Sequence, residues 1–128
     1  MTDWLDNLGA YLVTQSIGTL GTDIFNNYMP ATPDNCVALY QSGGTAPDNV
    51  ASWYNPGLQV RVRNTDQATG RTKAKAIIDA IHDKTFTSST TLFEYVRALN
   101  DPYCLGLDKN KRWEWTINFE ITYSEVAI

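Results

Sequence analysis

The segment WEWTINFEITY, residues 113–123, alternates strictly between apolar and polar side chains. Every second residue from Trp113 to Tyr123 is aromatic or aliphatic, and the residues between them are glutamate, threonine or asparagine. Successive side chains of a β-strand point to opposite faces, so the pattern predicts a long strand with one buried face. The chain must therefore build a sheet that packs one face on a core, and this strand is long enough to project beyond its neighbours.

A second strand is predicted in PGLQVRVRN, residues 56–64. One face would point to the core and carries Leu58, Val60 and Val62. The other face carries Gln59, Arg61 and Arg63. Arg61 is the first lysine or arginine in the chain, so the strand also marks a change in charge.

The other predicted elements are helices at about 3–15 and 68–83, an extended segment at about 23–29, and strands at about 36–41 and 91–97. In the second helix the apolar stripe is formed by Ala74, Ile77, Ile78 and Ile81. Two helices cannot cover both faces of such a sheet. We therefore predict one α+β domain over residues 1–128, with a single mixed or antiparallel sheet of four to five strands and two main helices packed on one face. The other face would meet water or a partner.

Charge is divided unevenly along the chain. The formal net charge is −4, and all 10 lysines and arginines come at or after Arg61, whereas the first 60 residues carry only aspartates. An acidic chain is a poor match for wrapping DNA, because neutralised phosphates supply most of that affinity. No apolar stretch reaches the length of a transmembrane helix, so no membrane partner is expected.

The sequence offers little chemistry. One histidine, His82, and two distant cysteines, Cys36 and Cys104, do not supply a zinc site. The segment ATGRTKAKA at 68–76 lacks the glycine and G-K-[ST] pattern of a phosphate loop, so Arg71 and Lys73 are interpreted as a solvated basic face. We expect no catalytic residues, no metal and no cofactor, and the two cysteines are predicted to be reduced thiols.

A long loop is predicted at 43–57, and Trp53 and Tyr54 lie inside it. Exposed aromatic residues in a loop are typical interface anchors. The alternative is that the loop folds back and buries both rings. The sequence leaves these two possibilities open.

Three segments together resemble a known family: PDNCVALYQSGG at 33–44, PGLQVRVRN at 56–64, and DPYCLGLDKNKRWEWTINFEI at 101–121. Their order and spacing are similar to those of the minor capsid or tail terminator proteins of long-tailed bacteriophages. The resemblance implies a non-enzymatic α+β virion protein that forms a hexameric ring. Such a ring caps the finished tail tube, stops its polymerisation and joins it to the head.

The implied partners are further copies of the chain, the major tail tube protein and the head–tail connector protein, while DNA passes through the ring without specific binding. The implied location is the head-proximal end of the tail, after assembly in the host cytoplasm. A closed ring uses heterologous contacts, in which two different patches meet. We therefore expect the cations from Arg61 to Lys84 to face the acid-rich N-terminal half of a neighbour. The candidate contact residues are Arg61, Arg63, Trp53, Tyr54, Arg71 and Lys73.

Other functions stay open at this point. The chain could instead complete the head or form the tail tube itself. A small binding module with Trp53 and Tyr54 in its pocket would be a monomer with one apolar cleft. An enzyme has the least support.

Overall fold

Strand β7 (Trp113–Glu125) is the central element of the structure, a computed structural model that describes residues 3–47 and 53–126. One edge of β7 pairs with β3 (Asn55–Asn64), antiparallel. The other edge is shared by two strands placed end to end: β6 (Tyr103–Leu107) and β5 (Thr91–Ala98). The predicted long strand is confirmed, and its extra length is occupied by β6 instead of projecting freely.

Three further strands complete the sheet. They are β1 (Ile24–Asn26), which is parallel to β2, β2 (Cys36–Thr45), which is antiparallel to β3, and β4 (Phe86–Ser88), which is antiparallel to β5. The order is β1-β2-β3-β7-β5-β4, with β6 beside β7. The α+β class is confirmed, but four to five strands was wrong, because the described residues form a seven-stranded mixed sheet. The short strands β4 and β6 were not predicted.

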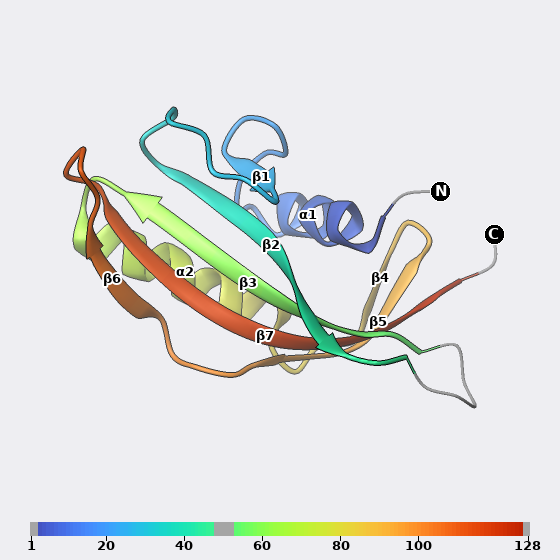
Figure 1. Ribbon diagram of the computed structural model, residues 1–128. Coiled ribbons are helices and arrows are strands. Elements are labelled where there is room, and N and C mark those ends of the chain that lie inside the picture. Colours follow the sequence, from blue (N-terminus) through green and yellow to red (C-terminus); the bar gives the residue numbers. More distant parts are fainter. Residues whose placement is uncertain (1–2, 48–52, 127–128) are drawn as a thin grey trace.

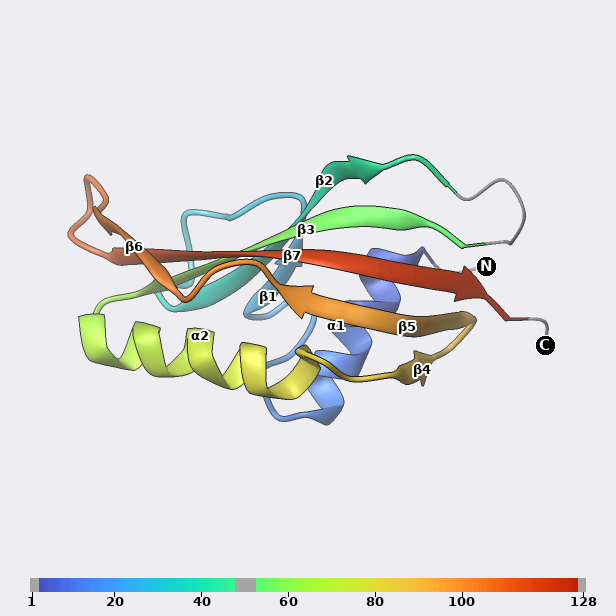
Figure 2. The ribbon, with the colours of Figure 1, turned by 90° about the horizontal axis from the view of Figure 1, so that it is seen from below.

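Helices α1 (Trp4–Thr14) and α2 (Gln67–Ile81) lie on the same side of the sheet (Figure 2). Each begins at an aspartate whose side chain accepts a backbone N–H: Asp3 from Leu5 and Asp66 from Thr69. Such caps satisfy donors that the first turn leaves without partners. Within the part of the chain that the structure describes, no helix is both long enough and apolar enough to cross a membrane.

The core lies between this helix layer and the sheet. On β3 it takes Leu58, Val60 and Val62, each no more than 1% exposed, as the alternation predicted. On β7 it takes Trp115, Ile117, Phe119 and Ile121. Each fully buried side chain of this kind contributes about 1.5–3 kcal/mol relative to leaving it in water.

The sheet is elongated, and its two ends differ (Figure 1). At one end β2 and β3 extend as an arm toward residues 48–52, which lie outside the described residues, and the chain termini are at this end. At the opposite end lies the turn between β6 and β7. The predicted loop at 43–57 is therefore shorter than expected, since its first three and last three residues belong to β2 and β3.

Candidate assembly surface

Arg61 lies on the sheet face that the helices leave open. Its register partner on β7 is Thr116, and its guanidinium is 3.7 Å from the carboxylate of Glu114. The Arg61 Nε also donates to Gln59 Oε1 at 3.3 Å. With 39% of its side chain exposed, Arg61 keeps donors for a partner, although Glu114 offsets part of its charge.

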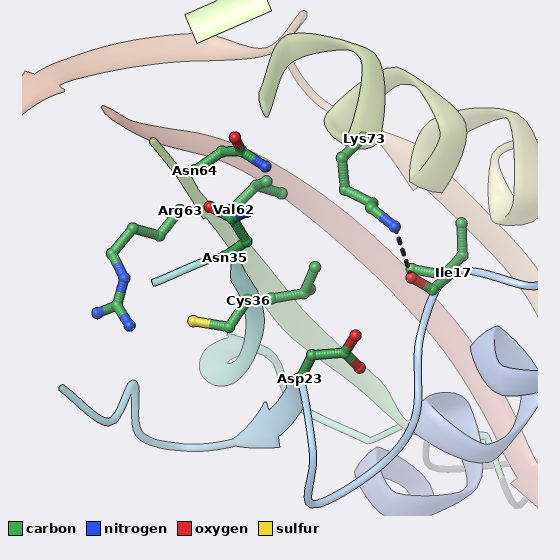
Figure 3. Close-up of a pocket in the computed structure, with 9 residues that line it drawn as sticks. Ile17, Asp23, Asn35, Cys36, Val62, Arg63, Asn64 and Lys73 are labelled. Carbon is green, nitrogen blue, oxygen red and sulfur yellow. Dashed lines mark hydrogen bonds between the residues drawn. The ribbon is translucent and has the colours of Figure 1, made fainter. Parts of the chain in front are cut away.

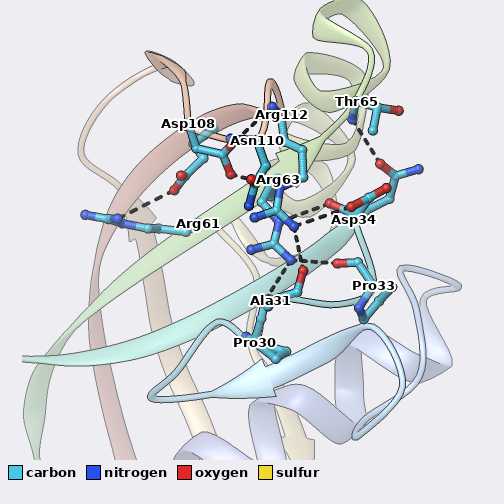
Figure 4. Close-up of polar contacts among 12 residues, drawn as sticks. Pro30, Ala31, Pro33, Asp34, Arg61, Arg63, Thr65, Asp108, Asn110 and Arg112 are labelled. Carbon is cyan, nitrogen blue, oxygen red and sulfur yellow. Dashed lines mark hydrogen bonds and ion pairs between the residues drawn. The ribbon is translucent and has the colours of Figure 1, made fainter.

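Arg63, two residues further along β3, has a different environment (Figure 4). Its Nε donates to the carbonyl oxygen of Asp34 at 3.0 Å, and one terminal nitrogen donates to those of Pro30 and Pro33 at 2.7 and 2.6 Å. The residue is 4% exposed because the segment 30–34 covers it. Arg63 therefore anchors a loop of its own subunit, and its guanidinium is not open to a neighbour. Arg61 and Arg63, which the sequence placed on the same strand face, therefore differ in exposure.

Arg112, which the sequence analysis did not single out, completes this anchor. Its terminal nitrogen donates to the carbonyl of Ala31 at 2.5 Å and lies 3.4 Å from the carboxylate of Asp34. Its Nε donates to Asp108 Oδ2 at 2.9 Å. The backbone N–H of Arg112, followed by its side chain, lowers the pKa of Asp108 below its usual range. The two arginines thus bind the 30–34 segment to β3 and to the β6–β7 turn.

Arg71 and Lys73, both on α2, do not form a joint basic patch. The guanidinium of Arg71 lies 5.0 Å from the ring centre of Trp115, a cation–π contact, and the residue is otherwise exposed. The Lys73 ammonium donates to the carbonyl oxygen of Ile17 at 2.7 Å (Figure 3). Lys73 therefore ties the segment after α1 to α2, and of these two cations only Arg71 stays open to a partner.

Trp53 and Tyr54 directly precede β3, at the outer end of the arm. Tyr54 forms a two-hydrogen-bond bridge with Tyr123 of β7, at 2.8 and 3.0 Å, and the two rings stack with centres 5.1 Å apart. Tyr54 is nevertheless 40% exposed, and Trp53 is half-buried. Burial, followed by the nearby Glu125 and Asp3 carboxylates, raises the pKa of Tyr123. Tyr54 is thus fixed to the sheet while part of its side chain stays accessible. The sequence left open whether the loop aromatics are exposed or buried, and the structure lies between these two possibilities.

Two hollows are lined by described residues. One of about 230 Å³ contains Asp23, Cys36 and Lys73 among its lining residues (Figure 3). Burial raises the pKa of the Cys36 thiol, which disfavours the reactive thiolate. A groove of about 480 Å³ on the open sheet face is bordered by Tyr95 and Leu99.

His82 and the cysteines have structural surroundings. The Nδ1 of His82 accepts the backbone N–H of Ala98 at 3.0 Å, which joins the end of α2 to β5. Cys36 and Cys104 are free thiols. Within residues 3–47 and 53–126, no group of three histidine, cysteine or acidic side chains could hold a metal ion.

Known proteins resemble this chain in fold and in family. No curated protein sequence matches the chain. A chain in the solved virion of a native gene transfer agent particle has the same fold, with a TM-score of 0.64 at 17% identity over 91% of this chain and 84% of that one. The family model described as "Bacteriophage tail terminator protein" matches residues 11–125, which include all seven strands and all of α2. This match confirms the resemblance seen in the sequence: the chain belongs to the bacteriophage tail terminator protein family, and it is a structural, tail-related protein of a virion.

Proposed function

We propose that this protein closes the tail tube as a ring of identical subunits, stops its polymerisation and forms the joint to the head connector. The observation that carries the proposal is the family match, since it extends over 11–125 and so takes in the whole sheet. The ring is hexameric in this proposal and sits at the head-proximal end of the tail, after assembly in the host cytoplasm. Its partners are the major tail tube protein and the head–tail connector protein.

The open face of the sheet suits a structural role. Its charges are matched in pairs, Arg61 with Glu114 and Arg97 with Glu120, and Gln59 donates to Asn118. A face of matched charges and amides offers hydrogen bonds without a strong field of either sign. The net charge of −4 also suits a ring through which DNA slides without binding, because few phosphates would be neutralised.

Three of the six candidate contact residues keep an available group in the isolated subunit: Arg61, Arg71 and Tyr54. We propose these three, with the half-buried Trp53, as contacts to other virion proteins. Arg63 and Lys73 are left out, because the main-chain carbonyls of their own subunit already engage them. The basic half therefore does not act as one uniform surface.

The direct test is negative-stain microscopy of purified protein mixed with isolated tail tubes of the same phage. We expect a ring at one end of each tube and no further growth when tube protein is added. Arg61→Glu should lower the fraction of capped tubes, while Lys75→Glu on the exposed side of α2 should cap like the parent protein. Tubes that keep growing with the protein present would refute the proposal.

The alternative virion roles give different results in the same assay. A tube-forming protein would polymerise by itself into tubes. A head-completion protein would leave tail tubes uncapped but would retain DNA in filled heads. Each result would replace the terminator function with another structural one.

A further inference from the structure

Strand β6 has one edge without a strand partner among the described residues. The sheet pairs β6 with β7 only, so its other edge presents backbone N–H and C=O groups to the surroundings. Its three largest side chains are exposed, Tyr103 at 63%, Leu105 at 46% and Leu107 at 53%. Soluble proteins usually protect such an edge with charge, proline or a covering segment, and an exposed apolar edge is a site for strand addition.

A second open edge lies on the other side of the same sheet. β1 pairs only with Val37, Ala38 and Leu39 of β2. Within the part of the chain that the structure describes, residues 42–45 of β2 therefore have β3 on one side, with a bulge between Ser42 and Thr45, and no strand on the other. All four of these residues are exposed. The sequence there is Ser-Gly-Gly-Thr, and a side chain added at Gly43 would meet open space.

These two edges complement each other in shape. β6 carries a row of bulky side chains, whereas 42–45 is a run of small residues with open space beside Gly43. The edges also belong to opposite borders of the sheet, since β2 lies on the β1 side and β6 on the far side of β7. One copy therefore cannot pair its own two edges, but a second copy could.

The charges at the two ends are complementary as well. The turn that follows β6 exposes Lys109 and Lys111, and neither forms an ion pair within the described residues. The arm end carries the exposed acids Asp3 and Glu125, which both act on Tyr123. Opposite charges on the two ends favour a head-to-tail encounter between copies and disfavour a head-to-head one.

We infer that β6 adds as a strand to residues 42–45 of β2 in a second copy of this chain, with Lys109 and Lys111 directed toward the acidic arm end of that copy. The contact is heterologous, so each subunit uses one edge as donor and the other as acceptor. It deepens the proposed function by naming the subunit contact of the ring. It also differs from the contact expected from sequence, which used the cations from Arg61 to Lys84.

Cross-linking between two variants tests the pairing directly. Leu105→Cys and Gly43→Cys are made separately in a Cys104→Ser background and mixed, and a short bismaleimide is added. The expected product is a covalent dimer several-fold more abundant in the mixture than in either variant alone. A Tyr28→Cys variant, at another exposed position, replaces Gly43→Cys as the control. Dominant Leu105–Leu105 product would overturn the inference, because it indicates a head-to-head contact.

Reversing the charges at the two ends of the subunit tests whether these ends meet in the contact. Lys111→Glu and Glu125→Lys should each weaken self-association at least tenfold in sedimentation experiments at low salt, and the two changes in one chain should restore it. Lys75→Glu should have no effect. Leu105→Lys, which gives β6 a protective charge, should leave a folded monomer with an unchanged melting temperature. Association that none of Lys111→Glu, Glu125→Lys and Leu105→Lys alters would overturn the inference.

The experiments separate this inference from the proposed function. Where the protein is monomeric in free solution, the cross-linking is repeated with tail tubes present, and lack of the Leu105–Gly43 product in both conditions overturns the contact. Capped tubes with no such product would leave the terminator function standing and refute the β6 contact. The product without capping would support the contact and refute the terminator function.

Discussion

Arg63 and Arg112 both bind main-chain carbonyl oxygens of the same loop, residues 30–34. Arg63 donates to the carbonyl oxygens of Pro30, Pro33 and Asp34, while Arg112 donates to that of Ala31 and pairs with the Asp34 carboxylate. One arginine comes from β3 and the other from the end of the β6–β7 turn. A planar guanidinium presents five donors in a rigid fork, a geometry that the compact ammonium of lysine does not reproduce. The loop is therefore held by two buried cations instead of by apolar packing alone.

Replacing Arg63 with methionine should destabilise the subunit by about 2–5 kcal/mol, because three main-chain acceptors lose a charged donor in a buried place. Urea unfolding followed by fluorescence measures the change. Arg61→Met is the matched control on the same strand, and it should cost no more than about 1 kcal/mol, since its ion pair is exposed. Equal losses for the two variants would contradict the anchoring role of Arg63.

Asp108→Asn tests the pH dependence of this anchor. The folded-state pKa of Asp108 is lowered, so its stabilising effect is full above the unfolded pKa of about 3.9 and is lost as pH falls through the folded value. The variant should be less stable than the parent at pH 7, and the difference should shrink below about pH 4. Urea unfolding across this range measures it, with the exposed Asp101→Asn as control. A difference that is constant with pH would contradict the ionic contribution.

Gly70→Ala tests how closely α2 approaches β7. A Cβ at this position would lie 2.9 Å from two atoms of the Trp115 indole, which is closer than normal contact. Alanine favours the helix by about 1 kcal/mol, but overpacking a core costs about 1–3 kcal/mol. We expect net destabilisation of about 1 kcal/mol and altered tryptophan fluorescence. Thr72→Ala, at an exposed position of α2, should be neutral or stabilising, and the same result for Gly70→Ala would refute the close contact.

Asn7→Ala tests the junction between α1 and the β4–β5 turn. The buried side chain of Asn7 donates to the hydroxyl of Thr91 at 2.9 Å. The Ser88 hydroxyl donates to the main-chain carbonyl oxygen of Asn7 at 2.7 Å. Removing the amide leaves the fully buried Thr91 without this donor, at a cost of about 1–3 kcal/mol. Calorimetric melting measures the loss. The exposed Gln15→Ala is the control, and a loss no larger than its own would contradict the role of Asn7.

The sequence predicted those parts of the fold that repeat a simple period. The alternation from Trp113 to Tyr123 and the stripe around Ile77 located β7 and α2, because burial of one face imposes that pattern. β6 was missed since Gly106, with φ at +101°, breaks its register and its large side chains remain exposed. Its half-buried positions are Cys104 and Gly106, so the strand shows no large apolar side chains at the spacing of a core face.

The candidate contact residues were harder to predict for a related reason. Arg63 looks the same as Arg61 in the sequence, and only the 30–34 segment, almost 30 residues earlier in the chain, distinguishes them by covering one. Only a weak signal in the sequence pointed to the role of Arg112, which ends the charged segment DKNKR and lies four residues after its partner Asp108. Tertiary contacts of this separation are not visible in local periodicity.

The position of β7 in the sheet has a consequence for how the protein is made. All three partners of β7, namely β3, β5 and β6, precede it in the chain. During synthesis the two halves of the sheet therefore cannot be joined through β7 until residues 113–125 leave the ribosome. Folding that depends on such distant pairings is slow and open to aggregation. Completion of the sheet in each subunit thus depends on the last strand of the chain, and a product truncated before β7 lacks the strand that joins β3 to β5 and β6.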